Sequence, residues 1–281
     1  MSTLQINPTT QVPARPSSGL TAWWTETRVF ALRNLEHIRQ VPEKLLDVTL
    51  QPLMFVMLFA YVFGGAIKVE GGYRDFILAG VMIQSLTFGM MGPGTAIATD
   101  LTEGVIDRFR SLPVRRTAYL SGHYVAELVG QVLSMVVLMG AGLLIGWGIH
   151  SSVVSALGGF ALLLVFSSLM IWIGTYVGLL VRAPDAVMGV AFVVVFPLTF
   201  VSSTFVPMDT LPGFLQGFAT WNPITVMVAA VRELFGNAPS PIAHHTWPLD
   251  HPVPAAFAYC AVLLAVVVPL TIRRYRVRTT D

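Results

Sequence analysis

Long apolar runs alternate with short polar segments along most of the chain. The run from Val153 to Val181 contains no charged residue and exceeds the ~20 residues with which an α-helix crosses a bilayer. The core of a soluble helical protein does not need such a run, so we predict an all-α integral membrane protein. The same pattern predicts six spans: Leu45–Gly64, Phe76–Ala96, Tyr124–Trp147, Val153–Val181, Val187–Phe205 and Pro254–Ile272.

Proline residues predict irregularities in the first two spans. Pro52 lies inside the first span, where neighbouring helices must satisfy the carbonyl group that it leaves without a donor. Pro93, between Gly92 and Gly94, should bend or end the second span. Neither span is therefore expected to be a straight helix.

Glycines four residues apart predict close helix packing in the next two spans. Gly142 and Gly146 lie in the third span, and Gly174 and Gly178 lie in the fourth. Small residues at this spacing allow two helix backbones to approach each other. We interpret both pairs as packing features.

The segment between the fifth and sixth spans contains apolar residues but no full span. Pro223 to Phe235 is apolar, too short to cross, and ends in Arg232 and Glu233. Counting it as a span would place the basic C-terminus on the outer side. We expect residues 206–236 to form re-entrant or interfacial helices on the outer face, with Leu211–Thr220 as the shorter one.

The N-terminal 44 residues divide into two predicted parts. Residues 1–20 are polar and rich in Pro, Ser and Thr, which predicts a disordered cytosolic tail. Residues 21–44 have helical periodicity with an aromatic end and a basic side, which is typical of a helix lying in the membrane interface. A soluble helix packed on a partner is the alternative. The residues that define this helix are Trp23, Trp24, Arg28 and Arg33.

Composition and charge placement support a membrane location. The chain is 54% hydrophobic and 11% charged, whereas a soluble domain has about 25% charged residues. With six spans and both termini in the cytosol, only Lys68, Arg74 and Arg232 among the 17 Lys and Arg residues lie outside. Cytosolic loops of membrane proteins are enriched in basic residues. We predict a multi-pass protein of the plasma (bacterial inner) membrane, with residues 45–272 as its membrane domain and 273–281 as a basic cytosolic tail.

A charged segment from Asp100 to Arg116 separates two almost uncharged regions. Its apolar residues fall on one helical face, Gly104 offers a bend, and Pro113 should stop the helix. A short amphipathic helix that is joined to two spans could transmit the movement of a soluble partner. A solvated basic loop is the alternative. The apolar face comprises Leu101, Val105, Phe109 and Leu112.

These segments together resemble the membrane subunit of type-2 ABC exporters, in the branch of the daunorubicin-resistance permeases. The resemblance covers nearly the whole chain, and the order of its motifs is more specific than any one of them. The matching residues are Tyr73, Phe76 and Gly80, then the run from Asp100 through Gly104 and Pro113 to Arg116, then Phe205, Pro207, Leu211, Pro212, Asn222 and Pro223.

The resemblance implies a machine in which two membrane subunits pair, each on a cytosolic ATP-binding cassette subunit. It implies export of a hydrophobic or amphipathic compound, with a glycolipid or polysaccharide as the alternative cargo. The interfacial helix and the coupling helix 100–116 would contact the ATPase subunit, and Phe205, Pro207 and Pro223 would form an outer gate. The implied coupling residues are Asp100, Glu103, Gly104, Asp107, Arg108, Phe109, Arg110 and Pro113.

The sequence contains no phosphate-binding loop of the Gly-x-x-x-x-Gly-Lys-Ser/Thr type. We therefore expect a transport subunit and not an enzyme, with no cofactor of its own and with ATP and Mg²⁺ on the partner. No nucleic-acid partner is expected. His244, His245, His251 and Asp250 lie near one another in the chain, but their spacing fits no known metal site, so no metal is expected.

Glu127 is the most polar residue inside a predicted span. Gln131 lies one helical turn after it and His123 one turn before it. An ionisable group inside a membrane is a functional candidate, but Glu127 is only about a turn and a half from the predicted cytosolic end. A structural role and a role in substrate or proton handling both remain open. An ion-coupled carrier using Glu127 is the alternative from another class, weakened by the absence of an inverted repeat.

Overall fold

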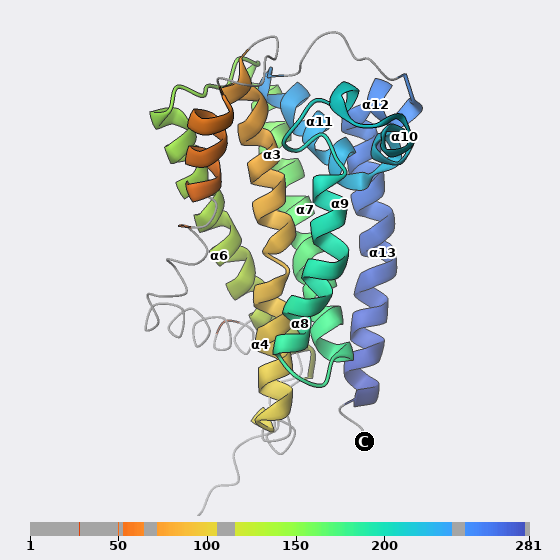
Figure 1. The fold of residues 1–281 in the computed structure, drawn as a ribbon. Helices are drawn as coiled ribbons and strands as arrows, with labels where there is room; N and C mark the ends of the chain where they lie inside the picture. Colours follow the sequence, from red (N-terminus) through yellow and green to blue (C-terminus); the bar gives the residue numbers. More distant parts are fainter. Residues whose placement is uncertain are drawn as a thin grey trace, which may run out of the picture.

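The computed structural model describes residues 28, 50, 53–64, 72–105, 116–237 and 245–278. All elements formed by these residues are helices (Figure 1). Arg28 and Leu50 are both helical and exposed. The other residues predicted to define the interfacial helix, together with Pro52 and residues 107–113 of the coupling segment, lie outside the described ranges.

Among the described residues, four helical stretches are long and apolar enough to cross a membrane. They are Tyr73–Thr102, Tyr119–Leu144, Val153–Leu180 and Pro252–Arg278. A fifth candidate is the pair α10 (Gly213–Trp221) and α11 (Pro223–Phe235), which is bent by 69°. The all-helical, multi-pass class predicted from the sequence is confirmed. The first and fifth predicted spans contain only the shorter apolar helices Leu53–Val62 and Asp185–Phe200 within the described ranges.

Helix boundaries differ from the prediction mainly where polar residues continue a helix. α7 (Val153–Leu180) ends within one residue of the predicted span. α6 (Arg116–Leu144) begins eight residues before Tyr124, and α13 (Pro252–Arg278) continues through the basic residues that were predicted to form a tail. Hydropathy defines the apolar part of a helix and not the polar turns that extend it.

The second predicted span is broken near its middle. α3 (Tyr73–Phe88) and α4 (Met91–Thr102) are separated by a turn at Gly89 and Met90. Pro93 has no N–H group, so the carbonyl of Gly89 cannot receive the usual helical hydrogen bond. The prediction that Pro93 bends or ends this span is confirmed, and the break lies one turn before the proline.

The fifth predicted span is irregular and ends early. It comprises α8 (Asp185–Val190), the π-helical segment η2 (Ala191–Val195) and α9 (Phe196–Phe200). The predicted end at Phe205 is wrong, because the backbone leaves helical geometry at Val201. The Nδ2 atom of Asn222 donates to the carbonyls of Leu198 and Val201, at 2.7 Å each. Two of the carbonyls exposed by the helix end are therefore satisfied.

α7 contacts α3, α4, α6, α8, α11 and α13, so it is the central helix of the bundle (Figure 1). Its contact with α4 is made through backbone atoms. A β-carbon on Gly174 would overlap the carbonyl oxygen of Met90, and one on Gly178 would overlap that of Gly94. The prediction that this glycine pair allows close helix approach is confirmed.

The other glycine pair, in α6, has two different roles. A β-carbon on Gly142 would overlap the side chain of Leu78 in α3, which confirms its packing role. Gly146 instead ends α6, because its φ of 93° is readily available only to glycine. Arg74 Nη1 donates to the carbonyl of Ile145 at 3.0 Å and so satisfies an acceptor at this helix end.

Basic residues gather at one end of the bundle. Arg182 follows α7 at the same end as the basic C-terminal turns of α13, near the mark for the C-terminus (Figure 1). Arg278 Nη1 donates to the carbonyls of Leu179 and Val181, at 2.5 and 2.9 Å. Arg278 therefore joins α13 to the C-terminus of α7. We call this end of the bundle the basic end.

Candidate functional site

Arg232 of α11 is buried at the opposite end of the bundle and is 2% exposed. Its Nε and Nη2 atoms donate to the carbonyl of Phe76, at 3.0 and 2.9 Å, and Nη2 also donates to that of Ser203, at 2.9 Å. Its guanidinium carbon lies 3.5 Å from the ring centroid of Phe76. Carbonyl groups and an aromatic ring therefore solvate Arg232 inside the protein.

Tyr73 and Gly80 of α3 contact the same segment. The hydroxyl of Tyr73 donates to the carbonyl of Phe205 at 3.0 Å. A β-carbon on Gly80 would overlap the carbonyl oxygen of Thr204. We call Tyr73, Phe76, Gly80, residues 203–205 and Arg232 the carbonyl clamp. Tyr73, Phe76, Gly80 and Phe205 are all positions on which the family resemblance rests, and the clamp brings them together. In the sequence, more than a hundred residues separate the three α3 positions from Phe205.

The predicted gate residues lie in and beside the carbonyl clamp. Phe205 is buried within it. Pro223 is the first residue of α11, and the preceding Asn222 caps that helix by accepting from the N–H of Ile224 at 2.9 Å. Pro207 directly precedes the short helix η3 (Met208–Thr210). The structure thus places all three residues at one end of the bundle, and their gating role remains a prediction.

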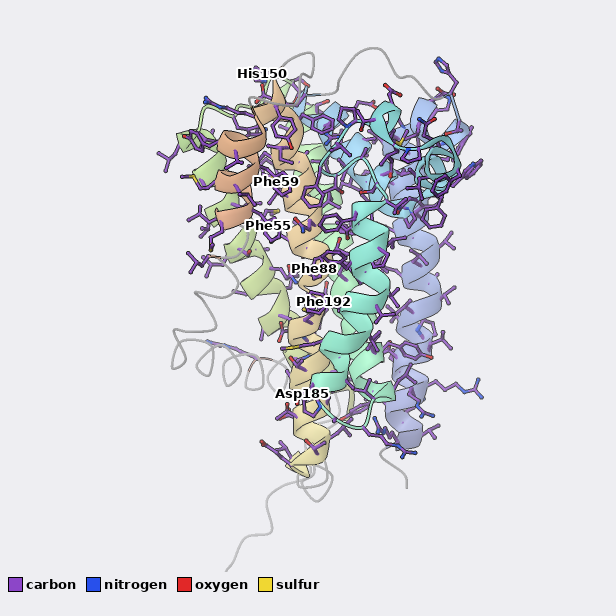
Figure 2. All side chains as sticks on the ribbon, in the orientation of Figure 1. Phe55, Phe59, Phe88, His150, Asp185 and Phe192 are labelled. Atoms are coloured by element: carbon purple, nitrogen blue, oxygen red, sulfur yellow. The ribbon has the colours of Figure 1, made fainter. Side chains whose placement is uncertain are left out.

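Seven phenylalanines form a continuous row along one face of the bundle, with neighbouring ring centroids 4.2–6.4 Å apart. Phe192, Phe196 and Phe200 are each at least 40% exposed. Figure 2 shows the two ends of this row, which lies between the helix that contains η1 (Leu58–Phe63) and helices η2 and α9. In spatial order, the phenylalanine row comprises Phe55, Phe59, Phe205, Phe200, Phe196, Phe192 and Phe88.

Hydrogen bonds join the loop between α6 and α7 to the end of α11. The N–H of His150 donates to the carbonyl of Phe235 at 2.9 Å, and Ser151 Oγ donates to that of Leu234 at 2.6 Å. Asn237 Nδ2 donates to the carbonyl of Gly148 at 3.2 Å. Because His150 lies at the end opposite Asp185 (Figure 2), these bonds fix α11 to α6 and α7 at the end that holds the carbonyl clamp.

At the basic end, Asp100 accepts a hydrogen bond from the hydroxyl of Tyr119. The ring of Tyr119 is stacked on that of Tyr275 in α13, with centroids 6.1 Å apart. Both rings belong to a small buried apolar cluster with Ile97 and Leu179. This cluster joins α4, α6, α7 and α13 beside the start of the predicted coupling segment.

The predicted coupling helix does not begin at Asp100, because Asp100 belongs to α4. That helix ends at Thr102, and the chain turns at Glu103 and Gly104. Gly104 has a φ of 68°, which is unfavourable for other residues and ends the helix as a C-terminal glycine commonly does. The bend expected at Gly104 is therefore present, and Glu103 is exposed beside it.

Glu127 and Gln131 lie one helical turn apart on α6. Glu127 is eleven residues from Arg116, where α6 begins, or about 16 Å along the helix axis. Both residues face the break between α3 and α4. A β-carbon on Gly92 would lie 3.2 Å from Glu127 Oε2, and one on Gly89 would overlap the amide of Gln131.

Within the described ranges, no group of three His, Cys, Asp or Glu residues is arranged to hold a metal ion. His245 Nδ1 lies 3.0 Å from Asp250 Oδ1 in an exposed pair. The adjacent His244 lies outside these ranges.

Sequence reasoning missed the carbonyl clamp and the phenylalanine row. The signal for the clamp is a single arginine inside the apolar segment Pro223–Phe235. The signal for the row was the four-residue spacing of Phe192, Phe196 and Phe200, which places them on one helix face. Neither signal identifies the partner helix.

Comparison with known proteins adds an independent line of evidence. The family model of the ABC-2 type transporter matches residues 25–235. The chain is 32% identical to a daunorubicin resistance ABC transporter permease protein of Streptomyces coeruleorubidus, over 94% of this chain and 89% of that protein. It is 26% identical to a doxorubicin resistance ABC transporter permease protein of Mycobacterium tuberculosis, over 72% and 71%. A putative transport permease of Cyanophora paradoxa is 25% identical, over 79% of each chain.

Proposed function

Because the chain belongs to the ABC-2 type transporter family, we propose that it is the membrane subunit of an ATP-driven exporter of hydrophobic or amphipathic compounds. A separate cytosolic ATP-binding cassette subunit supplies ATP hydrolysis, and a second membrane subunit completes the transporter. The chain lies in the plasma (bacterial inner) membrane as six spans with both termini in the cytosol. The drug-resistance names of two relatives support this class of cargo.

The observation that carries the mechanism is the joint between Asp100, Tyr119 and Tyr275. This joint connects the end of α4 to α6 and α13. Movement of an ATPase subunit against the coupling segment would therefore displace three helices together. Basic residues at the same end support its cytosolic orientation.

The break at Gly89 and Met90 provides a hinge between the two ends of the bundle. Phe88, directly before the break, contacts Phe192 of η2 with ring centroids 6.1 Å apart. A helix break and a π-helical segment thus lie side by side, and both are places where helices bend. Tilting of α4 would move the inner part of the phenylalanine row, while the carbonyl clamp holds α3 at the outer end.

The phenylalanine row supports an apolar transport path. Its rings offer extensive contact area without a charged group, and several are partly exposed. A hydrophobic cargo could move along the row from one aromatic ring to the next. The buried Phe205 belongs to this row and lies beside the other predicted gate residues.

The proposal is tested by reconstitution. The chain is co-expressed with an ATP-binding cassette subunit, purified as a complex and placed in liposomes with a lipophilic fluorescent dye. We expect ATP-dependent dye movement by the complex and none when the phosphate-loop lysine of the partner is replaced. Dye movement by the chain alone, driven by an ion gradient, would instead establish a carrier.

Glu103→Ala should reduce ATP-dependent transport about tenfold while the protein still inserts into the membrane. Glu103 is exposed at the turn after α4, so its loss removes a partner contact without opening the core. One charge-assisted contact is worth about 1.5–3 kcal/mol, which permits an effect of this size. Dye transport and ATPase activity are measured in the same liposomes, and Arg108→Ala should behave alike. Unchanged transport in both variants would exclude the coupling role.

Tyr119→Phe should weaken coupling less than Glu103→Ala does. We expect the number of dye molecules moved per ATP to fall by about threefold to tenfold. The variant keeps the stacked ring at Tyr275 but removes the hydroxyl that donates to Asp100, at a cost of about 1 kcal/mol. The measurement is the number of dye molecules moved per ATP hydrolysed. Transport per ATP equal to that of the unmodified protein would show that the bond to Asp100 does not transmit movement.

A further inference from the structure

Helix α10 exposes an aromatic face at the end of the bundle that holds the carbonyl clamp, here called the clamp end. Phe214, Phe218 and Trp221 are each more than half exposed. They are four and three residues apart, so they project from one side of the helix. The other exposed residues of α10 are Gly213 and Gly217, and the helix contains no charged residue. This face therefore offers no charged group to bulk water.

The short helix α12 (Trp247–Asp250) adds a fourth exposed aromatic residue beside α10. It contacts both α10 and α13, and Trp247 is more than half exposed. In Figure 1, α10 is viewed nearly along its axis, whereas α13 runs across the view, so α10 lies across the bundle. We call Phe214, Phe218, Trp221 and Trp247 the aromatic patch.

The helix that continues from α12 has an apolar surface along its length. Val262 and Val266 of α13 are exposed, and this helix is long and apolar enough to cross a membrane. Such side chains on a spanning helix contact lipid. Trp is enriched where a lipid-facing surface meets the membrane–water interface, and Phe and Trp are typical of helices that lie in this interface. The aromatic patch has this composition at one end of the lipid-facing surface.

We propose that the aromatic patch binds the lipid interface of the membrane at the clamp end. Its rings contact the ester and upper acyl-chain region, and the indole N–H groups donate to lipid oxygens. Asp209, shortly before α10, and Asp250, at the end of α12, are both exposed and remain in water. The partner is the bilayer itself, so the proposal requires a membrane location of the chain but not its export function.

The aromatic patch is connected to the end of α9 through one residue. Trp221 is followed directly by Asn222, which is 2% exposed and donates to the carbonyls of Leu198 and Val201, at 2.7 Å each. Lipid contact at Trp221 therefore also fixes the position of these carbonyls. The aromatic patch thus holds the end of α9, and with it Phe200, at a constant depth in the membrane.

Single cysteines test which medium surrounds the aromatic patch. Phe218→Cys and Gly217→Cys are labelled with an environment-sensitive fluorophore, and the complex is placed in phosphatidylcholine–phosphatidylglycerol vesicles. A β-carbon at Gly217 meets no atom within 4 Å, and the natural Cys260 is buried, so the unmodified chain gives the background. His245→Cys is the control, because His245 is a polar side chain that is 79% exposed.

Two quenchers are compared: a phosphatidylcholine that carries a nitroxide near its headgroup, and iodide on both sides of the vesicles. Relative to the control, both patch labels should be quenched about threefold more by the lipid and about threefold less by iodide. Iodide quenching equal to that of the control would place the patch in water and overturn the proposal. Protection from both quenchers would show that a second copy or another protein covers the patch, which would also overturn it.

Release of the aromatic patch tests its connection to α9. Phe214→Ser combined with Phe218→Ser should weaken lipid contact, so a label at Phe200→Cys should be quenched about twofold more by iodide. Leu144→Ser is the matched control, because it removes an exposed apolar side chain of α6 outside the patch. It should leave the Phe200 label unchanged. Equal quenching in the two backgrounds would show that lipid contact does not hold the end of α9.

Discussion

Arg232→Met is expected to abolish export and to lower thermal stability strongly. The guanidinium donates three hydrogen bonds of 3.0 Å or less, to the carbonyls of Phe76 and Ser203. Methionine fills similar space but removes all three bonds; the carbonyl of Ser203 loses this donor, at about 1–3 kcal/mol for a buried unsatisfied group. We expect the unfolding midpoint in detergent to fall by roughly 5 °C or more, together with loss of dye transport.

Arg232→Lys isolates the geometry from the charge. Lysine keeps the positive charge, but its compact ammonium group cannot reproduce the planar fork that joins two carbonyls. We therefore expect it to recover part of the stability and little of the transport. Arg274→Gln is the control, because Arg274 is exposed near the other end of α13. If Arg232→Met and Arg274→Gln have equal unfolding midpoints, the carbonyl clamp does not stabilise its end of the bundle.

The sequence predicts α7 well because residues next to both of its ends define where the helix begins and stops. Ser152 caps the N-terminus by accepting from the N–H of Ser155 at 3.2 Å, and charged residues begin directly after Val181. Between these points the helix contains no charged residue. Local composition is sufficient when a helix is defined by the contrast between membrane and water.

The early end of the fifth predicted span could not be read from its own residues. The segment after Phe200 contains no charged residue before Asp209, yet it turns, and distant groups satisfy its backbone. Asn222 supplies two hydrogen bonds to this end, and Arg232 supplies one to Ser203. A pattern of hydropathy does not contain such long-range donors.

The burial of Arg232 could not be predicted from the sequence for the same reason. A lone arginine near the end of an apolar segment is usually assigned to a membrane surface, where its side chain reaches water. Here, backbone carbonyls released by the turn at residues 201–205 replace water around the guanidinium. The matching positions Tyr73, Phe76 and Gly80 indicated that the region matters, but not that they meet Arg232.

Different sets of interactions hold the two ends of the bundle together. The end with the carbonyl clamp is held by hydrogen bonds to backbone carbonyls, from Arg74, Ser151 and Arg232. The basic end is held mainly by stacked rings around Tyr119 and by Arg278.

Gly174→Ala is expected to disrupt the centre of the bundle although it adds only one methyl group. A β-carbon at this position overlaps the backbone oxygen of Met90, which cannot rotate away as a side chain would. α7 and α4 must then separate beside the break at Gly89. Overpacking of this kind costs about 1–3 kcal/mol, and we expect a lower unfolding midpoint with transport reduced at least tenfold.

Gly130→Ala in α6 provides the matched control. No atom lies within 4 Å of its added β-carbon, and alanine is a better helix former than glycine by about 1 kcal/mol. This variant should therefore be as stable as the unmodified protein, or more stable, with full transport. Equal behaviour of the two variants in thermal unfolding and dye transport would contradict a backbone contact between α4 and α7. A defect confined to Gly174→Ala would establish that contact as the element that keeps the α3–α4 hinge against the central helix.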